Sequence, residues 1–162
     1  MRNVYLYAPN FISGLGSVTT VWLPYAVGAI WSYAVTNDRV RDNYHLAGFG
    51  ILRDPVQQVV DGLDDPAICA FSNYVWNEQY SLNLARKIKQ RWPNCLIVFG
   101  GAQTHSGYLS HNFIDSIVLG EGEYSFIKLL KDYLKNSKVE TLYPKSRVDN
   151  LESLPNPYAS DI

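Results

Sequence analysis

The chain has 162 residues, of which 47% are hydrophobic and 18% are charged, and its formal net charge is −1. This length suits one domain with its own core, and the hydrophobic content excludes a disordered chain. Fourteen basic residues against 15 acidic ones leave no excess of positive charge, which argues against a nucleic-acid partner. The sequence has no apolar run of about 18 residues and no signal peptide. We therefore expect a cytoplasmic protein without a membrane span.

Short apolar runs alternate with helical patterns along the chain. The runs typical of strands lie at 4–8, 46–52, 67–72, 95–99 and 116–119. The helical patterns lie at 20–35, 56–63, 78–92 and 124–134. Strands separated by helices form parallel sheets, and strands that are apolar throughout are covered on both faces. The pattern predicts an α/β domain over residues 1–135, built on a doubly wound, five-stranded parallel sheet.

Residues 136–162 are polar and contain Pro144, Pro155 and Pro157 without a clear periodicity. This composition predicts a linker that follows the domain. Since no further element closes the fold after it, we expect the chain to be a fragment of a longer protein.

The cysteines and histidines predict no metal site. Cys69 and Cys95 each lie inside an apolar run, which is typical of buried core thiols, and they form no CxxC pair. His45, His105 and His111 have no second ligand at a spacing that a metal would need.

Three strand-end loops contain the candidate ligand-binding residues, because ligands of doubly wound sheets bind outside the carboxyl ends of the strands. Residues 72–77 offer a hydroxyl, amides and aromatic rings, and Asn77 is also a candidate helix cap. Gly100 and Gly101 allow a ligand to approach the backbone, or form a tight turn. Residues 120–123 place two carboxylates at a helix start, where the helix dipole favours them in any case.

The other common ligand signatures of this fold class are missing. Gly14-x-Gly16-x-x-Thr19 lacks the third glycine of a dinucleotide fingerprint, and there is no phosphate-binding P-loop.

Four stretches taken together resemble the cobalamin-binding N-terminal domain of cobalamin-dependent radical-SAM enzymes. Ala70 to Glu78 resembles the family's S-x-Y-x-W-N stretch, and 88–101 resembles its K-x-x-x-P … V-x-G-G run. Asp115 to Glu123 resembles D-x-x-V-x-G-E-G-E, and Leu151 to Tyr158 is similar to the L-x-x-L-P-x-P-Y linker before the radical-SAM barrel. The resemblance covers nearly the whole chain and is least specific in the first 60 residues.

The resemblance implies a flavodoxin-like (Rossmann-like) sheet that holds cobalamin at its carboxyl edge, with the nucleotide tail inserted among the loops. Ser72 would meet the buried tail, and Gly100 and Gly101 would admit it. The implied cofactor-binding residues are Pro9, Asn10, Ser72, Asn73, Tyr74, Trp76, Gly100, Gly101, Gln103, Gly120, Glu121, Gly122 and Glu123.

The chain departs from the family's pattern in two places. Many cobalamin domains carry D-x-H-x-x-G after the first strand, and its histidine ligates cobalt. That loop has no histidine here, and the similar spacing around His45 lies at the second strand, so a His-off mode is implied. No C-x-x-x-C-x-x-C is present, which assigns the 4Fe-4S cluster and SAM to a domain expected after Ile162. The chain by itself would then not be catalytic, although the parent enzyme, of methyltransferase type, would be.

Two other hypotheses stay open at this point. The chain could be a stand-alone Rossmann-like module that has lost cobalamin and binds another ligand or a protein. It could also be a small enzyme that uses Glu121 and Glu123.

Overall fold

The structure is a computed structural model that describes residues 1–11, 13–15, 18–20 and 24–159, with side chains at 1–11 and 24–159. Its strands are β1 (Arg2–Asn10), β2 (Ser13–Leu15), β3 (Val18–Thr20), β4 (Tyr44–Leu52), β5 (Pro66–Ser72), β6 (Leu96–Gly100), β7 (Ser116–Gly120) and β8 (Leu142–Ser146). Its α-helices are α1 (Tyr25–Ala34), α2 (Asp38–Arg41), α3 (Val56–Asp61), α4 (Glu78–Arg91) and α5 (Glu123–Asn136). Two short 3₁₀ helices are η1 (Ser106–Ser110) and η2 (Leu151–Ser153).

The main sheet has six strands in the order β4-β1-β5-β6-β7-β8, and every neighbouring pair is parallel. Its first five strands in chain order follow 2-1-3-4-5, a common order of doubly wound sheets whose switch point lies between the first and third strands. That point here is the seam between β1 and β5. The α/β class and the parallel sheet are confirmed.

The predicted number of five strands was wrong, because β8 forms a sixth. It lies within 136–162, the segment that the sequence assigned to a linker. β8 pairs with β7 alone, so it can carry Pro144 and polar residues that a central strand would not tolerate. The extent of a linker after β8 stays a prediction, and 160–162 lie outside the described residues.

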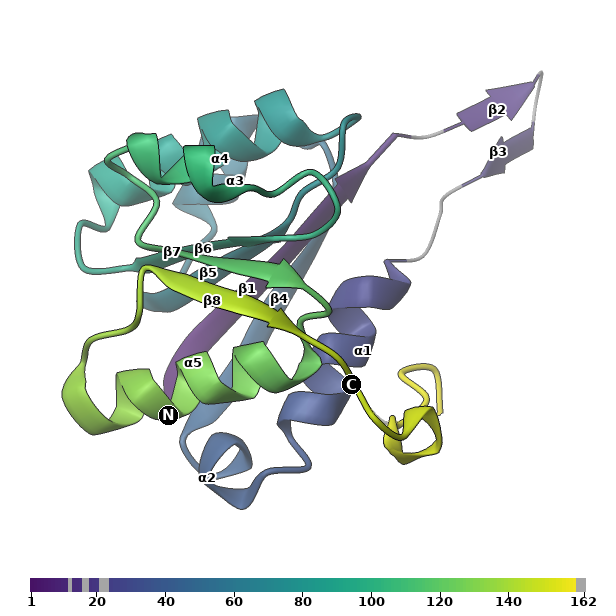
Figure 1. Cartoon of the computed structure of the whole chain (residues 1–162). Helices are drawn as coiled ribbons and strands as arrows, with labels where there is room; N and C mark the ends of the chain where they lie inside the picture. The colour runs from purple at the N-terminus through teal and green to yellow at the C-terminus, as the bar shows by residue number, and fades with distance from the viewer. Residues whose placement is uncertain (12, 16–17, 21–23, 160–162) are drawn as a thin grey trace.

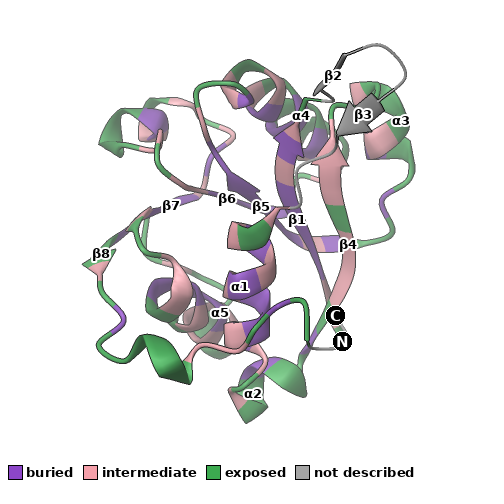
Figure 2. Cartoon of the chain, turned by 90° about the vertical axis from the view of Figure 1, so that its right-hand side faces the viewer, coloured by how far each residue is buried: buried purple, intermediate pink, exposed green. Residues whose placement is uncertain are grey.

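Helices cover both faces of the sheet (Figure 1). α3 and α4 pack on one face, and α1, α2 and α5 pack on the other. Successive residues of β1 point to opposite faces, so that Val4 and Leu6 join the α1/α5 core whereas Tyr5 and Tyr7 join the α3/α4 core. Figure 2 shows the buried residues concentrated in the central strands and on the sheet-facing sides of the helices.

Four aromatic rings form a row across the α3/α4 face of the sheet. Tyr7, Phe71 and Phe99 occupy paired positions on β1, β5 and β6, and their ring centroids lie 4.9 Å apart at both steps. Tyr108 of η1 extends the row at 5.8 Å from Phe99. All four side chains are buried. We call this set the aromatic row.

The region before α1 differs from the predicted helix at 20–35. Thr20 ends β3, which pairs antiparallel with β2 in a hairpin that extends beyond the sheet in Figure 1. α1 begins at Tyr25, directly after Pro24, and residues 21–23 of the predicted helix lie outside the described part of the chain. Proline is well tolerated at a helix start, because the backbone nitrogens there have no acceptor within the helix.

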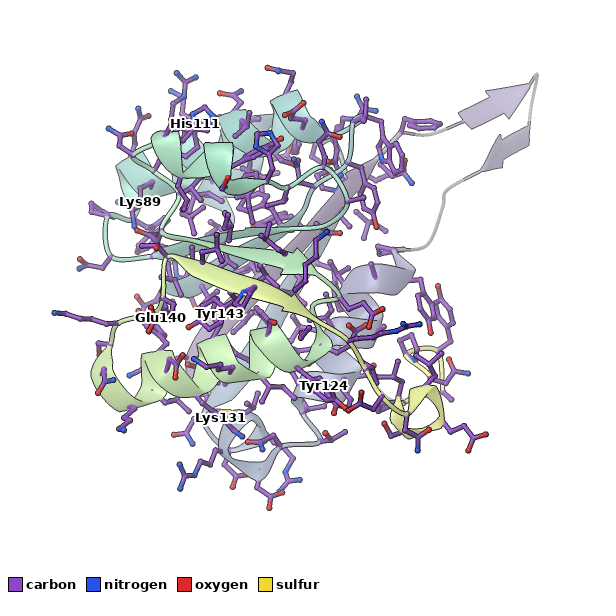
Figure 3. All side chains as sticks on the ribbon, viewed as in Figure 1. Lys89, His111, Tyr124, Lys131, Glu140 and Tyr143 are labelled. Carbon is purple, nitrogen blue, oxygen red and sulfur yellow. The ribbon has the colours of Figure 1, made fainter. Side chains whose placement is uncertain are left out.

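The amino edge of the sheet is closed by an ion pair. Lys89 of α4 lies 2.8 Å from Asp115, which precedes β7, and Figure 3 shows Lys89 at the edge where the strands begin. Lys89 also donates to the Cys95 carbonyl, and Asp115 accepts from the Ile97 backbone nitrogen at 2.7 Å. This contact therefore ties α4 to the starts of β6 and β7. Cys69 and Cys95 are free and buried, as predicted.

Candidate functional site

A cavity of about 580 Å³ opens at the carboxyl edge of the sheet, on the α1/α5 face. The carboxyl halves of β1, β5, β6 and β7 form one wall, and α1 with the first turns of α5 forms the other. Its inner surface is mostly apolar, with Leu6, Val27, Ala70, Val98, Val118 and Phe126. The cavity therefore lies beside the β1/β5 switch point, where doubly wound sheets bind their ligands.

The structure brings most of the predicted site residues to this cavity. Those that line it are Ser72, Tyr74, Gly100, Gly101, Gly120, Glu121, Gly122 and Glu123. The predicted residues that do not line it are Pro9, Asn10, Asn73, Trp76 and Gln103. Pro9 is buried in β1, and the Asn10 side chain accepts from the Phe11 backbone nitrogen. The assignment of all of them as cofactor contacts stays a prediction.

The turn after β5 is fixed by the side chain of Asn77. Its Nδ2 donates to the Ser72 carbonyl at 3.1 Å, and its Oδ1 accepts from the Tyr74 backbone nitrogen at 2.9 Å. Asn77 precedes α4 as predicted, but its side chain makes no capping bond to that helix because it bonds back to the turn. The turn thereby holds Ser72 at the cavity. Among the described residues, none hydrogen-bonds to the Ser72 hydroxyl.

The turns after β5 and β6 are interlocked through their backbones. The Asn73 nitrogen donates to the Gly100 carbonyl at 2.7 Å, and the Gln103 nitrogen donates to the Asn73 carbonyl at 3.1 Å. Gly101 adopts a φ of +93°, and a Cβ there would lie 2.7 Å from both the Asn73 nitrogen and its carbonyl oxygen. Only glycine permits this approach, so the predicted role of Gly101 in a tight turn has a steric cause.

Tyr74 and Trp76 stack on one another beside the cavity. Their ring centroids are 4.6 Å apart and their planes differ by 6°. Tyr74 lines the cavity, and Trp76, which is 47% exposed, lies behind it. The pair forms a flat, partly solvated aromatic surface next to the cavity.

The loop between β7 and α5 supplies the two carboxylates of the cavity. Glu121 accepts from the Val148 backbone nitrogen at 2.9 Å, and this hydrogen bond holds the chain after β8 in place. Glu123 begins α5, and its Oε2 is shielded from solvent without a hydrogen-bond partner among the described residues. Gly120 has a φ of +72° and lies against the side chain of Lys145. The cavity thus contains an acceptor that a bound hydroxyl or amide could satisfy.

Sequence reasoning missed the wall that α1 provides. Tyr25, Ala26 and Ile30 line the cavity, and Lys145 of β8 reaches it from the segment that the sequence assigned to a linker. Small and aliphatic helix residues give no sign of a ligand in a single sequence, since they read as ordinary core. Only the packing of α1 across the strand ends turns them into site residues.

The chain after η2 docks on the outer side of α1. Pro157 is buried against Gly28, where a Cβ would lie 3.1 Å from the proline ring. The rings of Tyr158 and Tyr25 have centroids 5.9 Å apart. Tyr25 therefore contacts both the cavity and the segment that resembles the L-x-x-L-P-x-P-Y linker.

The described residues hold no group of three or more His, Cys, Asp or Glu side chains that would bind a metal ion. In the same part of the chain, no helix has the length and apolar character needed to span a bilayer. Nor does any histidine line the cavity: His45 lies at the amino end of β4, and the His105 side chain accepts from the Gly107 backbone nitrogen.

Comparison with known proteins gives two informative relatives, although no protein-family model matches the sequence. The cobalamin-dependent radical SAM methyltransferase TokK of Streptomyces tokunonensis is 32% identical over 127 residues, which are 76% of this chain and 19% of TokK. The 2-(S-pantetheinyl)-carbapenam-3-carboxylate methyltransferase of Streptantibioticus cattleyicolor is 33% identical over 138 residues, which are 83% of this chain and 20% of that enzyme. The chain spans about a fifth of the length of these relatives and corresponds to a small part of each.

Proposed function

We propose that this chain binds cobalamin in a His-off mode and is the cofactor-holding part of a radical-SAM enzyme of methyltransferase type. The observation that carries the proposal is the cavity at the carboxyl edge, bordered by Gly100, Gly101 and Gly120 and containing the Ser72 hydroxyl, which has no hydrogen-bond partner among the described residues. The relatives add weight, because TokK is named as cobalamin-dependent and both are named as methyltransferases.

The residues of the cavity fit the nucleotide tail of cobalamin. The tail carries a flat aromatic base, a sugar and a phosphodiester, and it needs an apolar slot with a few polar contacts. Val98, Val118 and Phe126 supply the apolar surface. The Ser72 hydroxyl can bond to the base or the sugar, and Glu123 Oε2, which has no partner in the described part of the chain, can accept from a donor group. The corrin ring would then lie outside, over the strand ends and the Tyr74–Trp76 surface.

The positions of the histidines support the His-off mode. His45, the histidine with motif-like spacing, pairs with Asn3 at the amino end of β4, opposite the edge that bears the cavity. When bound, cobalamin would supply a cobalt centre that carries a methyl group. The chain's own residues would bind the tail, orient the ring and exclude water from the slot, whereas substrate contacts, the 4Fe-4S cluster and SAM belong to the rest of a longer enzyme.

The test is retention of hydroxocobalamin by the purified chain, read as a corrin spectrum that co-elutes with protein in gel filtration. A matched pair of variants assigns any binding to the cavity. Gly100→Val should fold and narrow the cavity, because a Cβ at Gly100 meets no atom closer than 3.5 Å. Gly62→Ala, at the end of α3, changes a glycine away from the cavity and should bind as the wild type does.

Folded wild-type chain that retains no hydroxocobalamin would refute the proposal and favour a module for another ligand or a protein. Equal retention by Gly100→Val would place the corrinoid elsewhere on the chain. The enzyme hypothesis built on Glu121 and Glu123 is the weaker alternative, since Glu121 is engaged with Val148 and Glu123 Oε2 has no hydrogen-bond partner among the described residues.

A further inference from the structure

A hydrogen-bond chain of two buried residues and one partly buried residue is attached to the two interlocked turns of the cavity. Asn73 Nδ2 donates to the Tyr108 hydroxyl at 2.8 Å, and that hydroxyl donates to a carboxylate oxygen of Glu78 in the first turn of α4. Asn73 has no exposed surface and Tyr108 is 3% exposed. None of the three residues lines the cavity.

Within the described residues, the Asn73 side chain has one hydrogen-bond partner, the Tyr108 hydroxyl. Asn73 Oδ1 is buried without a hydrogen bond in that part of the chain, so the amide is held through its nitrogen alone. The Asn73 backbone, in turn, bonds to both Gly100 and Gln103 of the neighbouring turn. Whatever orients Asn73 therefore sets the spacing between Ser72 on one side and Gly101 on the other.

Tyr108 is well placed to provide that orientation. Its ring packs against Phe99 at the end of the aromatic row and against the His105 ring at 4.9 Å. Burial and the bond to Glu78 raise the pKa of Tyr108 to about 12, so that the hydroxyl keeps its proton over the physiological range. It can thus accept from Asn73 and donate to Glu78 at the same time.

We propose that Tyr108 is a positioning residue that acts through Asn73: it fixes the relative position of the interlocked Ser72 and Gly101 turns, which border the cavity, and so confers preference for corrinoids that carry a nucleotide tail. The inference rests on the proposed function and deepens it, because it names the part of the cofactor that the cavity selects. A tail held in the cavity that these two turns border is sensitive to small shifts of the turns, whereas a ring resting on an open surface is not.

The experiment compares Tyr108→Phe with Tyr44→Phe in the full chain. Tyr44 is the matched control, because its buried hydroxyl donates to the Leu130 carbonyl at 2.8 Å in the opposite core and its pKa is likewise raised to about 12 by burial. Each protein is titrated with hydroxocobalamin and with dicyanocobinamide, which has the corrin ring but lacks the nucleotide tail. The quantity of interest is the ratio of the two affinities.

We expect wild type and Tyr44→Phe to share one preference for hydroxocobalamin, and Tyr108→Phe to reduce that preference about tenfold, the effect of one buried hydrogen bond. Glu78→Gln keeps an acceptor for the phenol, so its loss of preference for hydroxocobalamin should be smaller. This variant takes the place of Tyr108→Phe if Tyr108→Phe unfolds at too low a temperature to be titrated. An unchanged ratio in both Tyr108→Phe and Glu78→Gln overturns the inference. A wild type that binds both corrinoids equally well also overturns the inference, but it leaves the proposed cobalamin binding intact. A wild type that binds neither corrinoid overturns both the proposed function and the inference.

Discussion

The two edges of the sheet use polar groups in opposite ways. At the amino edge, Lys89 and Asp115 bond to each other and to the backbones of Cys95 and Ile97. At the carboxyl edge, the Ser72 hydroxyl and one oxygen of Glu123 have no partner among the described residues. The Lys89–Asp115 contact at the first edge is satisfied internally, while the second edge retains bonding capacity at Ser72 and Glu123 that a ligand can use.

The contrast separates two kinds of residue within the family-like stretches. The stretch at 88–101 contains both Lys89 and Gly100, and the stretch at 115–123 contains both Asp115 and Glu123. In each, the first residue holds the fold and the last faces the cavity. A sequence resemblance alone gives them equal weight, but variants of the two edges should fail in different assays.

The largest effect is expected from Gly101→Ala at the carboxyl edge. Alanine is strained at a φ of +93°, and its Cβ would lie 2.7 Å from Asn73 backbone atoms, so both turns must shift. We expect a loss of about 2–3 kcal/mol in the free energy of unfolding and at least about a tenfold loss in hydroxocobalamin affinity. Urea unfolding and titration measure the two. Gly62→Ala, where the backbone is right-handed helical, should be close to neutral in both.

Next in size is Asp115→Ala at the amino edge. It leaves the Ile97 nitrogen without its acceptor and Lys89 without its carboxylate, in a pair whose side chains are only 22% and 29% exposed. We expect about 2 kcal/mol less stability in urea with hydroxocobalamin affinity unchanged. Arg41→Ala removes an ion pair whose side chains are 56% and 77% exposed and should cost no more than about 0.5 kcal/mol. Weaker cobalamin binding by folded Asp115→Ala would contradict the separation of the edges.

A pair of serines at the two edges gives the sharpest test at smaller effect. Ser116 is fully buried and donates to the Glu140 carbonyl at 2.8 Å, so Ser116→Ala should cost about 1 kcal/mol of stability without changing corrinoid affinity. Ser72→Ala should do the reverse, with stability unchanged within about 0.5 kcal/mol and affinity lowered about fivefold. Thermal melts and titrations of both variants decide this, and the same outcome for both serines would refute the comparison.

The smallest expected effect is on stability at acidic pH, through the carboxyl group of Asp132. Partial burial opposes ionisation of Asp132, but the Lys128 ammonium and the Tyr143 hydroxyl outweigh it and lower the pKa of this carboxyl below its ordinary 3.8. A lowered pKa contributes stability above the ordinary value, and that contribution is lost as the pH falls through the folded-state pKa. Wild type should therefore lose slightly more stability than Asp132→Asn between pH 5 and strongly acidic solution, as followed by urea midpoints. Corrinoid affinity at neutral pH should be the same in both.

Most of the fold could be predicted because central strands and amphipathic helices leave strong patterns. The predicted helix at 78–92 matches α4 to within one residue, and the apolar run at 67–72 lies within β5. β8 was not predicted, because an edge strand is buried on fewer sides and its sequence is polar, with Pro144 inside it. The glycine turns beside the cavity could be predicted because glycines that follow a strand are a recognisable turn signal. The position of Ile30 and Lys145 at the cavity depends on tertiary packing, which no local sequence pattern predicts.

The aromatic row has a consequence for the entropy of binding. Tyr7, Phe71, Phe99 and Tyr108 span β1, β5, β6 and η1, so these elements cannot slide past one another without separating stacked rings. Phe71 also forms part of the cavity wall. The strand ends beside the cavity are therefore held in place when the chain folds, before any ligand arrives. A ligand that enters does not have to immobilise them, and more of its contact energy is expressed as affinity.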